Sequence, residues 1–166
     1  MREMTERFLK EAFAGESQAS LKYGAFADRA EKEYPNVARL FRAVSYAERV
    51  HATNHLRALG GLKGTLDNLA VGAAGESFEI NEMYPAYLAV AELQQEKLAK
   101  RSLGDALETE KAHLALYEAA KGAVAGGADA QVGTLQICDV CGWTVEGEAP
   151  DICPLCKAKK ERFKSF

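Results

Sequence analysis

Four long stretches of the chain repeat their apolar residues at alternating steps of three and four, the spacing of a helix with one inward face. The first two stripes are Leu9, Phe13, Glu16, Ser20, Tyr23 and Ala27, then Val37, Phe41, Val44, Glu48, His51, His55 and Ala58. The others are Glu79, Glu82, Ala86, Ala89 and Leu93, then Leu103, Leu107, Glu110, His113, Tyr117 and Ala120. This pattern predicts four helices, each with an acidic side chain on its inward face.

Helix-breaking residues separate these stretches. Tyr34-Pro35-Asn36 divides the first two helices, and Leu59-Gly60-Gly61 closes the second. We expect residues 60–75 to form a long connection, and Pro85 to cause a kink or bulge beside Glu82. Short links within each helix pair and one long crossover are typical of a ferritin-like bundle.

The inward acids need a cationic partner. A carboxylate buried alone loses hydration worth several kcal/mol, so a cluster of carboxylates without a counter-charge is excluded from a core. Neither lysine nor arginine falls on the four stripes. Two divalent metal ions would compensate most of the charge, with His51 and His113 as neutral nitrogen ligands. The acids concerned are Glu16, Glu48, Glu79, Glu82 and Glu110.

Two Glu-x-x-His units strengthen this prediction. Glu48-Arg-Val-His51 and Glu110-Lys-Ala-His113 each place an acid and an imidazole one turn apart on a helix. One such unit is weak evidence, because it arises often by chance. Two of them, with further inward acids on the other helices, are the signature of ferritin-like di-iron or di-manganese bundles.

The two helix pairs have the same layout, an inward glutamate followed by a Glu-x-x-His unit. Glu16 precedes the first unit by nearly the same distance as Glu79 precedes the second. The string Ala-Gly-Glu-Ser recurs at 14–17 and 74–77 and would pair Glu16 with Glu76 instead. We assign Glu79 to the metal ligands and expect Glu76 at the surface or just outside them.

Composition limits the class of protein. The chain has 166 residues, 48% hydrophobic content and a net charge of −3, which suits one bundle with a small appendage. The absence of a basic patch argues against nucleic-acid binding. The N-terminus is charged and helical in period, and no apolar run approaches a membrane span. We expect a cytoplasmic protein without a membrane segment.

The end of the chain differs in composition from the rest. A Gly/Ala-rich stretch predicts a linker at 127–133, between a bundle at 1–126 and a second domain at 134–166. Cys138-Asp-Val-Cys141 and Cys153-Pro-Leu-Cys156 form two Cys-x-x-Cys knuckles, separated by residues 142–152. Paired knuckles bring four thiolates around one tetrahedral ion. The spacing alone leaves zinc and iron open.

The second domain resembles rubredoxin. The resemblance rests on Cys138-Asp-Val-Cys141-Gly-Trp and on Gly147-Glu-Ala-Pro-Asp-Ile-Cys153-Pro-Leu-Cys156. It implies iron bound by four cysteines, with Trp143, Phe163 and Phe166 as a small aromatic core. Lys157 stands where rubredoxins usually have glycine, and a left-handed backbone there would cost lysine ~1 kcal/mol or more.

A metal-binding bundle followed by such a domain resembles the rubrerythrin family over nearly the whole chain. The matching strings are Ala12-Phe-Ala-Gly-Glu16-Ser-Gln, Tyr46-Ala-Glu48-Arg-Val-His51 and Gly75-Glu-Ser-Phe-Glu79-Ile-Asn-Glu82-Met-Tyr-Pro. The implied fold is mainly α, a ferritin-like four-helix bundle followed by a rubredoxin-like domain with short β-strands. The implied cofactors are a di-iron centre and one iron bound by Cys138, Cys141, Cys153 and Cys156.

The same resemblance implies roles for the ligands. Glu48 and Glu110 would bridge the two irons, and Glu16 would be terminal on one. Glu79 and His113 would be terminal on the other. Glu82 and His51 would compete for the first iron, the acid binding when it is oxidised and the imidazole when it is reduced. Two tyrosines match those beside the family's metal site, or are core tyrosines with satisfied hydroxyls: Tyr23 and Tyr87.

The implied function is reduction of hydrogen peroxide to water by a non-haem di-iron peroxidase. Electrons would come through the rubredoxin-like iron from rubredoxin or an NAD(P)H-dependent rubredoxin reductase, because the chain has no Gly-x-Gly-x-x-Gly nicotinamide motif. Family members act as homodimers with electron transfer between subunits. Two alternatives stay open, an iron-binding ferroxidase and a non-enzymatic bundle with a zinc-ribbon interaction module. His55 is either a zinc partner of His51 or a polar core neighbour.

Overall fold

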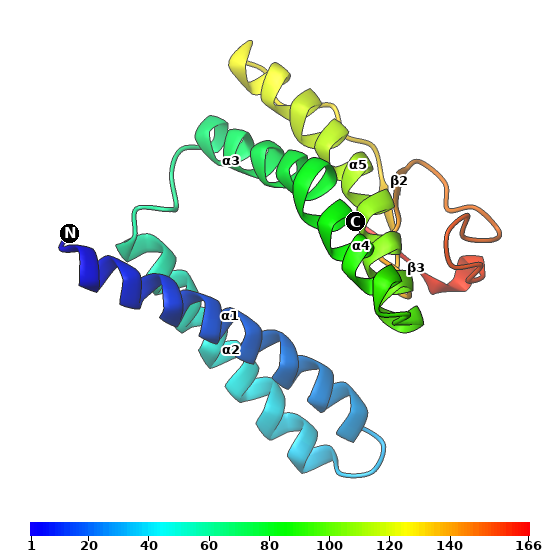
Figure 1. Ribbon diagram of the computed structural model, residues 1–166, viewed down its shortest axis with the longest axis horizontal. Coiled ribbons are helices and arrows are strands. Elements are labelled where there is room, and N and C mark those ends of the chain that lie inside the picture. Colours follow the sequence, from blue (N-terminus) through cyan, green and yellow to red (C-terminus); the bar gives the residue numbers. More distant parts are fainter. The chain divides into compact units, whose positions relative to one another are not determined.

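The computed structural model describes residues 1–166, which form two compact units, Met1–Lys63 and Gly64–Phe166 (Figure 1). Four helical rods are followed by a small three-stranded sheet, which confirms the predicted mainly α fold class. None of the helices combines the length and the apolar character needed to cross a lipid bilayer.

The first unit is a hairpin of two long helices, α1 (Glu3–Ala30) and α2 (Pro35–Ala58), shown in blue and cyan in Figure 1. Pro35 begins α2, where its missing N–H leaves no helical bond unmade. After α2, Gly60 adopts a φ of 69° and its N–H donates to the Arg57 carbonyl at 2.9 Å. Both predicted helix boundaries are confirmed.

Small residues bring α1 and α2 close together. Ala27 and Ala38 are fully buried. The Ser20 hydroxyl donates to the Ser45 carbonyl at 2.9 Å, and the Ser45 hydroxyl donates to the Ser20 carbonyl at 2.7 Å. This reciprocal pair joins the two helices and satisfies both hydroxyls.

The second unit begins with a helical rod made of α3 (Thr65–Phe78), a π-helical turn (Glu79–Met83) and α4 (Tyr84–Leu93). It packs along α5 (Lys97–Ala125), as the green and yellow ribbons of Figure 1 show. The prediction that residues 60–75 form a connection is therefore wrong from Thr65 onward.

The glycines of α3 explain this error. They suggest a loop in the sequence, but a Cβ on Gly72 would lie 3.2 Å from Cε2 of the Tyr117 ring on α5. Glycine at position 72 therefore serves the close packing of two helices. The accompanying loss of helix propensity, about 1 kcal/mol relative to alanine, is offset by this packing.

The predicted bulge near Glu82 is confirmed. Pro85 lies in the first turn of α4 and cannot donate a backbone hydrogen bond. Just before it, the N–H of Tyr84 bonds to the carbonyl of Glu79, five residues back instead of four. The π turn therefore holds one surplus residue and changes which side chains share a face before and after it.

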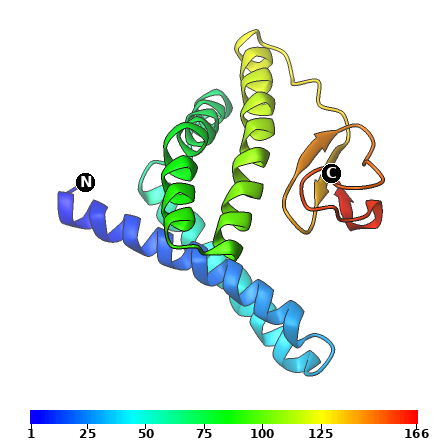
Figure 2. The same ribbon diagram turned by 45° about the vertical axis from the view of Figure 1, so that its right-hand side comes forward.

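A sheet completes the second unit (Figure 2). Its strands β1 (Leu135–Cys138), β2 (Thr144–Glu146) and β3 (Phe163–Ser165) are antiparallel in the order β2-β1-β3. Only part of the predicted aromatic core is confirmed. Trp143 and Phe163 meet edge to face with ring centroids 6.2 Å apart, but Phe166 is 76% exposed. Positions 163 and 166 are three residues apart, so along a strand they point to opposite faces.

Candidate metal centres

The four cysteines lie together at one end of the sheet. Cys138 and Cys153 are fully buried, and the sulfur pairs Cys138–Cys156 and Cys141–Cys153 are each 3.6 Å apart. Four thiolates at ~2.3 Å from one ion in a tetrahedron would have sulfurs about 3.8 Å apart. The donor set and its spacing therefore fit a single tetrahedral metal ion.

Both knuckles use the same backbone turn. The N–H of Gly142 donates to the Cys138 carbonyl at 2.8 Å, and that of Lys157 donates to the Cys153 carbonyl at 3.1 Å. The φ angles are 83° at Gly142 and 65° at Lys157, so the lysine adopts the left-handed backbone in spite of its cost. Its ammonium group donates to the Pro154 carbonyl at 2.8 Å, which offsets part of the strain.

The thiols need a cation to be deprotonated together. Burial raises the pKa of Cys141. Burial also acts to raise the pKa of Cys153, but the backbone N–H groups of Cys156 and Leu155 outweigh it and lower that pKa overall. A bound cation favours the thiolate form of all four.

The first unit holds one cluster of acids and an imidazole, formed by Glu16 of α1 with Glu48 and His51 of α2. One ligand atom from each lies within 4.8 Å of the others. The Nδ1 atom of His51 is 2.8 Å from Oε2 of Glu48, whose side chain is 19% exposed, whereas the imidazole is 56% exposed. The predicted Glu-x-x-His unit thus brings the carboxylate of Glu48 and the imidazole of His51 together beside Glu16.

The second unit holds a matching cluster of Glu76 on α3 with Glu110 and His113 on α5. Nδ1 of His113 is 2.6 Å from Oε2 of Glu110, and their side chains are 32% and 15% exposed. The structure corrects the expected position of Glu76, which lies among the ligand atoms. The signal in the sequence is the repeated Ala-Gly-Glu-Ser string, which equates Glu76 with Glu16.

The acids of this cluster repel one another. Burial, the charge of Glu110 and a hydrogen bond with it raise the pKa of Glu76 to about 7. Burial and the Glu110 charge also raise the pKa of Glu79, which lies beside the cluster but outside the three-residue group. A bound divalent ion relieves this repulsion, because its positive charge attracts the carboxylates that otherwise repel one another.

Other predicted residues lie elsewhere. Glu82 is exposed and belongs to none of the three clusters. Tyr87 is 51% exposed, and Tyr23 packs against the rings of Phe26 and Phe41 with centroids 6.2 Å away. His55 is half-buried and also joins no cluster.

The tyrosine beside the acids is Tyr84. Burial and the charges of Glu79, Glu110 and Glu76 raise its pKa, so its hydroxyl keeps its proton and can donate it. Its position follows from the π turn that immediately precedes it, which counting at 3.6 residues per turn misses.

The raised pKa of Glu76 predicts how the metal-free chain responds to pH. The pKa of Glu76 is higher in the folded chain than its ordinary value of 4.5. The contribution of this side chain to folding stability is therefore fully present at low pH. The contribution is lost as pH rises through about 7. We expect the metal-free chain to lose about 1 kcal/mol of stability from this group between pH ~5 and ~8, allowing for solvent screening.

Thermal unfolding of the metal-free full chain, followed by circular dichroism, measures this effect. Glu76→Gln should flatten the fall of Tm with pH, and the exposed Glu118→Gln on α5 should leave it unchanged. An unaltered pH profile in Glu76→Gln would show that the acids do not interact as described.

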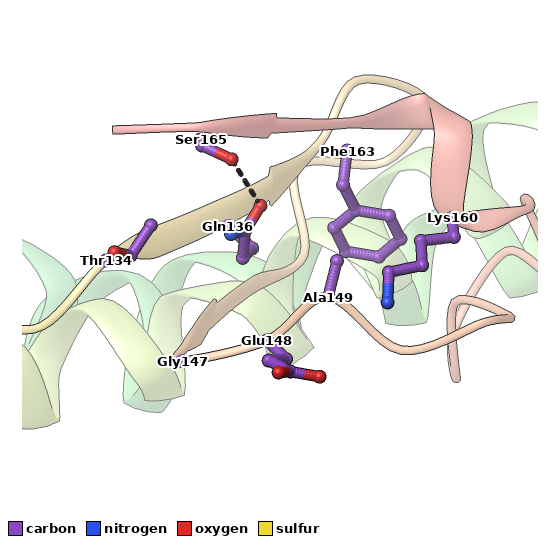
Figure 3. A pocket seen from close by; sticks show the side chains of 8 residues that line it. All are labelled: Thr134, Gln136, Gly147, Glu148, Ala149, Lys160, Phe163 and Ser165. Atoms are coloured by element: carbon purple, nitrogen blue, oxygen red, sulfur yellow. Dashed lines mark hydrogen bonds between the residues drawn. The ribbon is translucent and has the colours of Figure 1, made fainter.

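One surface hollow lies away from the cysteine cluster. It is an open groove of about 550 Å³ beside the sheet, where Phe163 and Lys160 lie and the Ser165 hydroxyl donates to Oε1 of Gln136 at 2.9 Å (Figure 3). None of the four cysteines lines it. The candidate chemistry of this chain therefore lies in the ligand clusters.

Comparison with known proteins places these clusters in one family. A family model described as rubrerythrin matches residues 7–121, and one described as the rubrerythrin rubredoxin-like domain matches residues 136–164. The chain is 39% identical to rubrerythrin-2 of Clostridium acetobutylicum over 178 aligned residues, covering 98% of this chain and 97% of the relative. It is 32% identical to a rubrerythrin of Porphyromonas gingivalis, covering 96% and 88%.

A solved structure agrees with these matches. The fully reduced, all-ferrous state of nigerythrin superposes with a TM-score of 0.56 at 30% identity, covering 98% of this chain and 86% of the other. The four thiols fit a single iron, and the acid and imidazole clusters supply the ligand types of a di-iron centre. The chain belongs to the rubrerythrin family, with a di-iron centre and a cysteine-bound iron as its cofactors.

Proposed function

We propose that this chain is a peroxidase that reduces hydrogen peroxide to water. The observation that carries this proposal is the presence of two kinds of metal ligand in one chain. Carboxylates and imidazoles suit a two-electron di-iron site, and four thiolates suit a one-electron iron site. A built-in electron donor serves a reductase, whereas oxidative iron storage has little use for one.

The proposed ligands of the di-iron centre have matching types in the two units. They are Glu16, Glu48, His51, Glu76, Glu110 and His113. The proposed bridging ligands are Glu48 and Glu110. Each lies within hydrogen-bonding distance of the histidine of its own Glu-x-x-His unit. Glu76 takes the terminal role beside His113, and Glu79 replaces Glu82 as the exchangeable acid because it lies beside the cluster.

Bound iron supplies two electrons, which with two protons convert one hydrogen peroxide into two waters. The residues around it manage protons and charge. Tyr84, whose pKa is raised by burial and by the charges of nearby acids, keeps its hydroxyl protonated and is the proposed proton donor. The carboxylates offset the extra positive charge of the oxidised metal pair.

The electron donor in this proposal is a separate protein, rubredoxin or an NAD(P)H-dependent reductase of rubredoxin. It reduces the cysteine-bound iron of this chain one electron at a time. The active form is a homodimer in the cytoplasm.

Metal analysis of the purified chain, with its visible spectrum and peroxide consumption, tests the function. We expect one iron at the cysteines, giving a red colour that a reductant bleaches, and two irons at the acids. The reduced chain should consume peroxide without releasing oxygen. A colourless zinc-bound C-terminal domain would favour an interaction module, and iron uptake far above this stoichiometry would favour storage. Either result would overturn the peroxidase.

A further inference from the structure

Lys157 directly follows the last cysteine and has an unusual backbone conformation. Its φ of 65° lies in the left-handed region, where a residue with a Cβ is strained. The C-terminal domain (residues 134–166) has two other residues with a positive φ, and both are glycines, Gly142 and Gly147. A strained residue that persists in a structure is a reason to ask what its side chain does.

The fold of the second knuckle requires the backbone of residue 157 but not its side chain. The N–H of Lys157 donates to the Cys153 carbonyl at 3.1 Å, and the N–H of Gly142 makes the equivalent bond to the Cys138 carbonyl at 2.8 Å. The first knuckle thus closes with glycine, which adopts this conformation without strain. Glycine would serve at position 157 too, so what the lysine adds is its ammonium group.

The ammonium group of Lys157 lies beside the second knuckle. Its Nζ donates to the carbonyl of Pro154 at 2.8 Å, so the side chain folds back toward the residues between the two cysteines of this knuckle. This partner is a neutral carbonyl, and the bond leaves the full positive charge of the ammonium in place. Arg162 is also near the cysteines, but its Nε donates to the Asp139 carboxylate at 2.7 Å, which offsets its charge.

The charge of the cysteine-bound iron site depends on its oxidation state. Four thiolates carry four negative charges, so the site has one net negative charge with ferric iron and two with ferrous iron. A fixed positive charge nearby therefore attracts the ferrous site about twice as strongly as the ferric site. Lys157 is exposed, so water and salt weaken this attraction.

We propose that Lys157 raises the reduction potential of the cysteine-bound iron, because its ammonium group favours the ferrous site over the ferric one. The reaction concerned is the uptake of one electron by ferric iron from an external one-electron reductant, which gives ferrous iron. No proton needs to move, because the lysine acts through its charge. The inference concerns this iron cofactor alone and holds whichever reaction the iron pair carries out.

A redox titration of the iron-loaded full chain, followed by its iron–thiolate absorption, tests this inference. Lys157→Gln is the informative variant, because its amide can still donate to the Pro154 carbonyl but carries no charge. At a fixed solution potential we expect the ratio of ferrous to ferric iron to fall about fivefold, which for one electron is a shift of about 40 mV to lower potential. Lys157→Arg keeps the charge and should keep the potential.

Two controls separate a local effect of this charge from a general one. Lys160→Gln removes a lysine from the groove of Figure 3, which none of the cysteines lines, and should shift the potential by much less. At about 1 M salt, where screening acts over ~3 Å, the difference between Lys157→Gln and the unmodified chain should shrink. An unchanged potential in Lys157→Gln, an equal shift in Lys160→Gln, or a difference that salt does not alter would overturn the proposal.

Thermal unfolding of the zinc-loaded chain tests the alternative that the lysine is kept for stability. Trp143 is the only tryptophan, so its fluorescence follows the C-terminal domain. Lys157→Gly should raise the unfolding temperature, because glycine adopts the left-handed backbone freely, and should lower the potential as Lys157→Gln does. A Lys157→Gly domain that is no more stable than the original would refute the strain from which the inference starts.

These outcomes are distinct from those that test the proposed function. A failure of Lys157→Gln to lower the potential would overturn the inference even if the chain is a peroxidase. A chain that shows the expected shift but consumes no peroxide would keep the role of Lys157 and refute the proposed function.

Discussion

Replacing Cys153 with serine is expected to abolish reductase-driven turnover. The di-iron centre should still consume peroxide after chemical reduction. Cys153 is fully buried, and its sulfur lies 3.6 Å from that of Cys141. A serine oxygen is a poor replacement for a thiolate on iron, so the one-electron site is lost. The proposed ligands of the iron pair lie on the helices and are unchanged.

Three measurements check this result. The iron–thiolate absorption should disappear, NAD(P)H oxidation with a rubredoxin reductase should fall to background, and dithionite-reduced protein should still consume one peroxide per iron pair. Ser165→Ala, which removes an exposed hydroxyl from the same domain, is the matched control and should behave as the unmodified chain. Normal turnover in Cys153→Ser would exclude the relay.

Replacing Glu110 with alanine is expected to have the opposite effect. Glu110 contacts His113 at 2.6 Å and hydrogen-bonds Glu76, so its carboxylate is the centre of the second cluster. Without it, the iron pair loses a proposed bridging ligand. Changes just outside a metal site already cost on the order of 10- to 100-fold in activity or affinity, and we expect at least the upper end here. The cysteine-bound iron should keep its colour.

Iron content and peroxide consumption measure this effect. Glu118→Ala, an exposed glutamate on the same helix that pairs with Lys121, is the control and should keep all its iron. The metal-free Glu110→Ala chain should also be less sensitive to pH, because the charge that raises the pKa of Glu76 is gone. Full iron occupancy in Glu110→Ala would rule out its role as a ligand.

The sequence predicts much of this molecule where one periodicity holds over many residues. The stripes of α1, α2 and α5 need no more than a constant 3.6-residue repeat, which also places Glu48 beside His51 and Glu110 beside His113. The cysteine knuckles follow from local spacing alone. Such features depend on residues within one or two turns of each other.

Other features depend on interactions that the repeat does not contain. Gly72 resembles a loop residue until the Tyr117 ring packed against it is known. Glu76 was set aside for another reason, because the spacing of Glu79 from the second Glu-x-x-His unit matches that of Glu16 from the first. The surplus residue at 79–83 then shifted the face beyond it, so that Tyr84 lies near the acids while Glu82 and Tyr87 are exposed.

The π-helical turn makes this region sensitive to changes in length. Removing one of residues 80–83 from the π-helical turn would restore ordinary helix and rotate everything that follows by about 100° relative to α3. Tyr84 would then leave the acids although no ligand had changed. An alignment that places a gap at residues 80–83 can therefore preserve every proposed metal ligand and still describe a differently built site.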